Sequence, residues 1–460
     1  MIDYAMDATY LVASVFFIIG IKMLSSPETA ARGNMLSALG MLMAVGATLV
    51  SGAIPDFTWI MVGVVIGSVV GIVGALLVKM NDMPQMVALF NGFGGAASAL
   101  VAVSEYYRLG AQLSPFITVV ILLSLFVGWL TTSGSVVAFL KLQELVSGNA
   151  VVFPLQHMIN LVLGLGTFAA MGFLVLEPGH ENIFFGIIAM GLLLGVLLVI
   201  PIGGADMPVV IALLNSYSGI AVSFTGFVLS NNVLIITGSL VGASGIFLTK
   251  EMCDGMNRSI WNVLFGGFGA DAGSGVPAME APGGIVKPYT IEDAITVLEN
   301  ADQVVFVPGY GMAAAQAQHV VRELGEALED RGITVKYAVH PVAGRMPGHM
   351  NVLLAEANVS YDALFDMDQI NDDFVNTDVS VIIGANDVVN PAAEEDPSSP
   401  IYGMPILHVD RSKTVIVLKR SMNPGFAGID NLLFYRDNTM MVFGDAKATL
   451  TKFNEGIKAG

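Results

Sequence analysis

Lys419, Arg420 and Ser421 place two cations and a hydroxyl directly after an apolar run. Such a set can hold a dianionic phosphate through charge-assisted hydrogen bonds. The surroundings are acidic, because the residues after 286 carry 13 Lys and Arg against 24 Asp and Glu, which is −11 of the total −18. Ordinary solvated charges are the alternative interpretation, and we favour a phosphate site.

A glycine turn, Gly309-Tyr310-Gly311, follows the apolar run 303–309 and precedes a helix that we expect to reach about Arg331. A buried strand, a glycine turn and a helix N-terminus form the setting in which backbone N–H groups bind a dinucleotide pyrophosphate. A turn without chemical use is the alternative. The next strand, 334–340, ends without the Asp or Glu that usually holds the NAD ribose, so NAD in its usual pose is disfavoured.

Two further polar loops, around Arg345 and Asp387, follow expected strands, and either could be only a turn. Thr290 and Asp293 have capping-box spacing and begin a helix to about Ala301.

The remaining strands are predicted at 379–384, 405–409, 414–418 and 439–443. Their alternation with helical stretches predicts a doubly wound, Rossmann-like α/β domain, in which ligands bind at the carboxyl ends of the strands.

Two segments resemble each other at a spacing of 124 residues, Asp82 to Asn91 and Asp206 to Asn215. Asp followed closely by Pro begins a helix well. Helix capping therefore explains the two carboxylates about as well as a functional role does. Each Asn comes nine residues later, about 13 Å along the helix axis and inside the hydrocarbon. A buried amide there should face the bundle interior, either to line a proton pathway with Ser135 or only to join helices. We favour the pathway.

Apolar stretches long enough to cross a bilayer predict a multi-span α-helical membrane bundle. We count nine, at about 4–23, 34–53, 57–78, 84–103, 115–140, 157–176, 182–200, 207–229 and 231–249. With the N-terminus outside, only Arg108 among the loop cations lies outside, so we expect the C-terminal region in the cytoplasm. His157 and His180 fall at the ends of segments, so this chain brings no His to the middle of the membrane.

A Gly- and Pro-rich segment from Gly266 to Lys287 predicts a mobile linker, with a packed surface loop as the alternative. The expected domains are therefore a membrane domain 1–260, a linker 261–288 and a nucleotide-binding domain 289–460. Cys253 is the single cysteine and can form no intrachain disulfide. The acidic charge argues against nucleic acid as a partner, and we expect no metal site.

Long motifs in both halves resemble the beta subunit of proton-translocating NAD(P) transhydrogenases. In the nucleotide-binding half they are residues 309–318, 340–357, 384–393 and 419–428. In the membrane half they are residues 133–139, 203–210 and 215–219. The resemblance covers nearly the whole chain, and the motifs are long enough to be specific.

The resemblance implies that NADP(H) lies on the C-terminal domain in a reversed orientation, with its 2′-phosphate on Lys419, Arg420 and Ser421 and a lid extending to Phe426. The implied cofactor-binding residues are Gly309, Tyr310, Gly311, Met312, Ala313, Val342, Ala343, Gly344, Arg345, Met346, Pro347, Gly384, Ala385, Asn386, Asp387, Val388, Gly403, Met404, Lys419, Arg420, Ser421, Met422, Asn423, Pro424, Gly425, Phe426, Asp445 and Ala446.

The implied activity is direct hydride transfer between this NADP(H) and NAD(H) on a partner alpha subunit, without an acid or base side chain. The implied assembly is a dimer of alpha–beta units in the lipid bilayer of a bacterial inner membrane, and the alpha subunit brings further membrane helices. The residues matching proton-pathway or coupling positions are Asp82, Asn91, Ser135, Asp206, Asn215 and Arg258.

Two positions depart from the family pattern. Some members of the family carry a proton-accepting His at the position of Asn91. In other members a helix of the partner supplies this His, so we expect the partner to supply it here. Phe426 stands where a Tyr is common, which puts a lid hydrogen bond in doubt. The alternative function is a secondary transporter or channel with a nucleotide-sensing domain, and a membrane-tethered NADP dehydrogenase is a weaker third interpretation.

Overall fold

The computed structural model describes residues 2–24, 26–50, 56–79, 82–110, 113–148, 150–265, 286–346, 348–399, 401–425 and 427–459. The chain divides into two compact units. One comprises Met1–Ile202 and Val210–Thr249, and the other comprises Gly203–Val209 and Lys250–Gly460.

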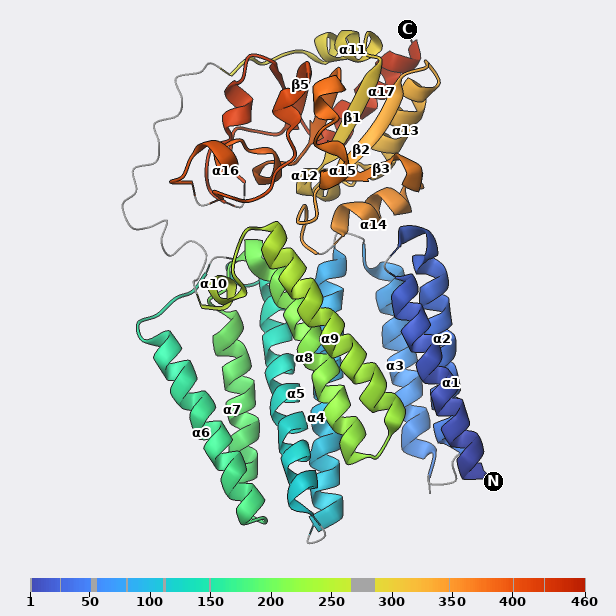
Figure 1. Cartoon of the computed structure of the whole chain (residues 1–460), viewed down its shortest axis with the longest axis vertical. Coiled ribbons are helices and arrows are strands. Elements are labelled where there is room, and N and C mark those ends of the chain that lie inside the picture. Colours follow the sequence, from blue (N-terminus) through green and yellow to red (C-terminus); the bar gives the residue numbers. More distant parts are fainter. Residues whose placement is uncertain are drawn as a thin grey trace. The chain divides into compact units, whose positions relative to one another are not determined.

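The described residues contain nine helices that are long and apolar enough to cross a membrane, as predicted (Figure 1). They are α1 (Ile2–Met23), α2 (Pro27–Val50), α3 (Thr58–Leu77), α4 (Met83–Leu109), α5 (Pro115–Leu142), α6 (Gln156–Leu176), α7 (Glu181–Val199), α8 (Met207–Val228) and α9 (Asn232–Gly255). The helices α4 and α9 continue to Leu109 and Gly255, beyond the predicted ends near 103 and 249.

Small residues allow close helix packing within the first unit. A Cβ atom added to Gly95 of α4 would lie 2.6 Å from the carbonyl oxygen of Gly128 in α5. At Gly219 of α8 it would lie 2.5 Å from the amide nitrogen of Gly242 in α9. Glycine is therefore required for these backbones to approach each other. The helix α3, in contrast, has no buried residue among those described.

The second unit contains a six-stranded sheet of order β3-β2-β1-β4-β5-β6, parallel throughout. Its strands are β1 (Gln303–Pro308), β2 (Thr334–Val339), β3 (Leu364–Asp366), β4 (Val379–Ile383), β5 (Thr414–Lys419) and β6 (Thr439–Phe443). The strand order reverses between β1 and β4, which is where doubly wound sheets bind ligands. The predicted Rossmann-like architecture is confirmed.

Helices cover the sheet. The helix α17 (Ala446–Ala459) packs against α11 (Ile291–Glu299) and α13 (Gln318–Glu329). The predicted capping box of Thr290 and Asp293 begins α11. The shorter segments are α10 (Ile260–Phe265), α12 (Tyr310–Ala314), α14 (His349–Glu356), α15 (Met367–Ile370), α16 (Ala392–Glu395) and the 3₁₀ turns η3 (Gly204–Asp206), η5 (Tyr361–Ala363), η6 (Phe374–Asn376), η7 (Asp387–Val389), η8 (Val409–Arg411) and η9 (Leu432–Tyr435).

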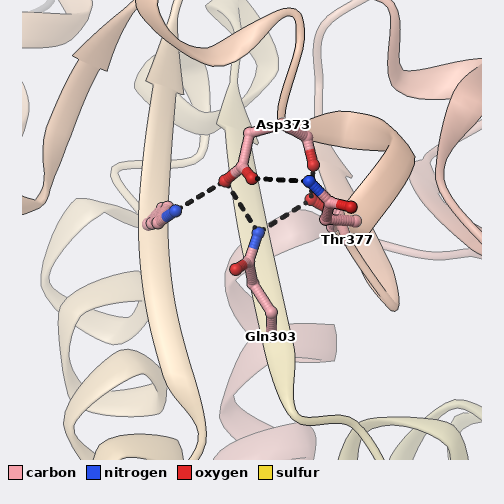
Figure 2. A network of polar contacts seen from close by, with 5 residues as sticks. Gln303, Asp373 and Thr377 are labelled. Carbon is pink, nitrogen blue, oxygen red and sulfur yellow. Dashed lines mark hydrogen bonds and ion pairs between the residues drawn. The ribbon is translucent and has the colours of Figure 1, made fainter.

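A polar network ties the strands together beside Gln303, the first residue of β1 (Figure 2). The Asp373 carboxylate accepts hydrogen bonds from the Gln303 amide at 3.0 Å and from the Lys336 ammonium. The Gln303 amide also donates to Thr377 Oγ1 at 3.1 Å. Hydrogen bonding to Lys336 is the largest cause that lowers the pKa of Asp373. The network lies at the end of β1 opposite the glycine turn, so we assign it to structure.

Two sequence predictions of local structure are wrong, and one strand is not predicted. The helix expected from Gly309 to Arg331 is two helices, because Gln316 adopts a left-handed conformation with φ of 49° between α12 and α13. Residues 405–409 form no strand, since their backbone groups bond to loops and side chains, such as Leu407 N–H to the Val388 carbonyl. The sheet instead gains β3, whose three residues are too few for a periodic signal.

The predicted linker lies largely outside the described residues, which end at 265 and resume at 286. Its first part, from residue 261, belongs to α10.

Candidate functional site

A cavity lies at the carboxyl ends of β1, β4 and β5, and most of the predicted cofactor residues line it. Between residues 286 and 459, the predicted residues in its wall are Gly309, Tyr310, Gly311, Val342, Ala343, Gly344, Gly384, Ala385, Asn386, Asp387, Val388, Met404, Lys419, Arg420, Ser421, Asn423, Pro424, Gly425, Asp445 and Ala446.

Other predicted residues do not line the cavity. Met312 and Ala313 are fully buried in α12, and Met422 packs against the hydrophobic core. Arg345, Met346 and Gly403 also lie outside the lining, whereas Pro347 and Phe426 fall outside the described residues. The prediction missed the lining residues Ala314, Ala315, Ile401, Leu418, Ala427 and Gly444, which carry no side-chain chemistry that could mark them.

The glycines of the first turn are required by a neighbouring loop. A Cβ atom on Gly309 would lie 2.3 Å from the Cα atom of Ala385, and one on Gly311 would lie 2.6 Å from the Cα atom of Gly384. Gly384 itself has a left-handed φ of 65°. The Gly311 amide donates to the Gly384 carbonyl at 3.0 Å. The loops after β1 and β4 therefore pack backbone to backbone and form one wall of the cavity.

The loop after β4 is also anchored to the segment after β5. The Ala427 amide donates to Asp387 Oδ2 at 3.0 Å. The Asn431 side chain donates to both the backbone and side-chain oxygens of Asn386, at 2.9 and 3.0 Å. Gly425 lies so close that a Cβ atom there would be 2.7 Å from Asp387 Oδ1. These contacts hold the segment after β5 against the cavity edge.

The cationic side of the cavity consists of Lys419, Arg420 and Ser421. Lys419 is half-buried, donates from Nζ to the Asn423 carbonyl at 2.6 Å, and lies 4.6 Å from the ring centre of Phe434. Burial lowers the pKa of its ammonium group, and the carboxylates of Asp387 and Asp430 oppose that shift. Arg420 and Ser421 are exposed. Two cations and a hydroxyl at one cavity wall fit the phosphate of a phosphorylated dinucleotide.

The loop after β2 is ordered by two neutral histidines. The guanidinium of Arg345 stacks 4.4 Å from the ring centre of Tyr310. The Arg345 amide donates to His349 Nδ1 at 2.9 Å, and the Val342 amide donates to His340 Nδ1 at 3.3 Å. Burial lowers the pKa of both imidazoles to about 4. Both rings are therefore neutral at physiological pH and act as hydrogen-bond acceptors for the loop.

The two repeat carboxylates have different partners in the structure. Asp82 occupies the N-cap position of α4, but its side chain caps no backbone N–H there. Asp206 is buried at the end of η3 and pairs with Arg258, whose Nη1 lies 3.4 Å from Oδ2. Burial raises the pKa of Asp206, and Arg258 opposes that shift. The interpretation as a simple side-chain cap is therefore wrong for Asp82, whereas the Asp206 carboxylate is engaged by Arg258.

The predicted polar residues of the bundle lie inside it. Asn91 is buried, and its amide donates to the Ile211 carbonyl of α8 at 3.2 Å. Ser135 Oγ is fully buried and has no hydrogen-bond partner among the described residues. A Cβ atom on Gly92 would touch Ser135 Cβ at 3.1 Å, so the Ser lies beside the turn that carries Asn91. Asn215 is half-buried in α8.

Comparison with known proteins yields a family match over almost the whole chain. Residues 6–455 match the model of the family described as NAD(P) transhydrogenase beta subunit. A curated Rhodospirillum rubrum protein named NAD(P) transhydrogenase subunit beta is 50% identical over 447 residues, which are 96% of this chain and 96% of the relative. A second curated protein of the same name, from Rhodospirillum rubrum strain ATCC 11170, matches this chain with the same identity and coverage.

Proposed function

This chain belongs to the NAD(P) transhydrogenase beta subunit family, and on that premise we propose that it exchanges hydride with a partner subunit and couples the exchange to proton movement. The family makes the chain a membrane subunit of an oxidoreductase that binds NADP(H) and works with an alpha subunit. The NAD(H) site, in this proposal, is on that alpha subunit.

The cavity at the carboxyl edge of the sheet is the observation that supports the proposed NADP(H) site. Lys419, Arg420 and Ser421 hold the 2′-phosphate, and the glycine turn of residues 309–311 receives the pyrophosphate. When bound, NADP(H) supplies the nicotinamide that gives or takes a hydride. The chain's own residues orient the nucleotide and exclude water, so the arrangement needs no side chain as acid or base. Arg345, from the loop after β2, stacks on Tyr310 of this glycine turn.

The membrane half supplies the coupling. We place the proton path at Asn91, Ser135 and Asn215, and the link to the nucleotide domain at Asp82, Asp206 and Arg258. A membrane potential supplies about 2.3 kcal/mol per proton per 100 mV, roughly a 50-fold shift in an equilibrium. An amide cannot titrate, so a His on a partner helix near Asn91 takes up the proton.

The topology follows from the loop charges. The N-terminus is outside, residues 1–260 span the membrane, residues 261–288 link the domains, and residues 289–460 lie in the cytoplasm of a bacterial cell. Two alpha–beta units form the complete enzyme.

The experiment is co-reconstitution of the full chain with an NAD-binding alpha subunit in lipid vesicles. We expect NADPH to reduce an NAD⁺ analogue, and the reaction to acidify or alkalinise the vesicle interior unless a protonophore is present. Vesicles without the alpha subunit are the control and should show no transfer. Absence of hydride transfer at every partner concentration would favour the transporter with a nucleotide-sensing domain.

A further inference from the structure

Polar side chains lie at seven-residue intervals along the buried face of α4. Asn91, Ser98 and Glu105 are all buried in this helix. Seven residues make about two helical turns, so successive members lie on one face about 10 Å apart along the axis. The line extends from Asn91, which the proposed proton path already contains, to the last turn of the helix.

A hydroxyl cluster occupies the middle of this line. Ser124 of α5 is fully buried, and its Oγ lies 3.0 Å from Thr225 Oγ1 of α8. The same hydroxyl lies 3.5 Å from the carbonyl oxygen of Ser98. Hydroxyl groups can both donate and accept, so they can pass a proton along or hold the water that does. This cluster joins α4, α5 and α8 beyond Asn91.

A carboxylate ends the line. The Glu105 side chain is 10% exposed, while its ion-pair partner Arg108 is 64% exposed. Arg108 Nη2 and Nε lie 2.6 and 2.9 Å from the Glu105 oxygens. Glu105 comes ten residues after Gly95, and the buried Thr118 of α5 comes ten before Gly128, which faces Gly95. Because α4 and α5 are antiparallel, Thr118 lies at the level of Glu105.

We propose that Glu105 is the outward terminal residue of the proton path, a role that rests on the function proposed above. A proton leaving the hydroxyl cluster binds to a Glu105 carboxylate oxygen and then passes to the water that reaches Arg108. The guanidinium pairs with the carboxylate that is left, which can then accept the next proton. The path is thereby extended from Asn91 along α4 to the outer end of the helix.

A surface ion pair does not account for this arrangement. Pairs three residues apart on an exposed helix contribute only about 0.2–0.5 kcal/mol, whereas a buried carboxylate loses hydration. Glu105 is buried in the bundle, and only its partner Arg108 is largely exposed. A buried carboxylate at one end of the line of polar residues in α4 therefore indicates a proton-accepting role for Glu105.

The test compares Glu105→Gln, Glu105→Asp and wild type in the co-reconstituted complex. In Glu105→Gln we expect steady-state proton-coupled hydride transfer to fall about tenfold or more, in line with losses of a proton-transferring group. Glu105→Asp should retain most of the activity. Single-turnover hydride transfer from preloaded NADPH, NADPH affinity and the thermal unfolding temperature should stay at wild-type values, because none of them requires a proton to leave the membrane.

The matched control is Glu181→Gln, since Glu181 is an exposed carboxylate in the first turn of α7, and it should behave as wild type. Wild-type turnover and proton movement in Glu105→Gln would overturn the inference. So would a joint fall of single-turnover transfer and unfolding temperature that Asp does not restore, since that marks a structural role. If wild-type vesicles transfer hydride without moving protons, the proposed coupling itself fails, whatever the variants do.

Discussion

At the scale of single residues, the phosphate site that we propose consists chiefly of Lys419 and Arg420. Lys419 is held by the Asn423 carbonyl and the Phe434 ring, so its ammonium group is already positioned at the cavity wall. Charged hydrogen bonds contribute about 1.5–3 kcal/mol each. Both the type and the spacing of these residues are visible in the sequence, because cations directly after a buried strand are unusual in an acidic domain.

We predict that the double variant Lys419→Ala, Arg420→Ala weakens NADPH binding to the full chain about 100-fold, from about 3 kcal/mol of lost interaction. NADH affinity should change little, because NADH lacks the 2′-phosphate. Equilibrium titration of both nucleotides measures the effect, and Lys452→Ala, at an exposed position of α17, is the control. Equal losses for the two nucleotides would refute the phosphate role.

His349 gives a pH dependence with a definite sign. Its folded-state pKa of about 4 lies below the ordinary value of 6.5. Protonation therefore favours the unfolded chain, and stability is lost as pH falls through the window between these values. At about pH 5 the loss is ~2 kcal/mol for this residue.

We predict that His349→Asn, which keeps an acceptor for the Arg345 amide, reduces the fall of the thermal unfolding temperature between about pH 7.5 and about pH 5. The exposed His319 provides the control variant His319→Asn, because its ring meets water in both states. An unchanged acid sensitivity in His349→Asn would show that the buried ring does not control it.

At the scale of elements, the periodicity and length of apolar runs predict the long helices and the five main strands. Local signals fail where tertiary contacts decide. Residues 405–409 are apolar enough for a strand, yet Asn371 binds the Ile406 carbonyl and the His408 amide. Similarly, Lys141 is only a loop charge in the sequence, whereas its ammonium is buried in the fold and donates to the Ile200 and Ile202 carbonyls at the end of α7.

Helix packing makes a matched pair of predictions. Gly95→Val should lower the yield and unfolding temperature of the full chain, because its Cβ atom would lie 2.6 Å from the Gly128 oxygen and overpacking costs about 1–3 kcal/mol. Gly67→Val in α3 should be tolerated by the isolated chain, since a Cβ atom there meets nothing within 4 Å in the described structure. Equal effects of both substitutions would contradict the close packing of α4 on α5.

At the scale of the whole molecule, composition separates an apolar bundle from an acidic α/β domain before any motif is considered. Family motifs then locate the cavity residues. The close backbone contact between the loops after β1 and β4 is not predictable from the sequence. A glycine is expected wherever a nucleotide or another backbone approaches closely, so the glycine pattern alone does not show which of the two is present. Glu105 is not identified from the sequence for a related reason, since burial of a charged side chain in the bundle is a property of the folded chain.

The central claim is that this chain, and not its partner, carries a pocket for the phosphorylated nucleotide. The most direct test is equilibrium binding of NADPH and NADH to the purified full chain without an alpha subunit. Our account predicts that NADPH binds about 100-fold more tightly, from two charge-assisted contacts to one phosphate. Equal affinity for the two nucleotides would contradict it.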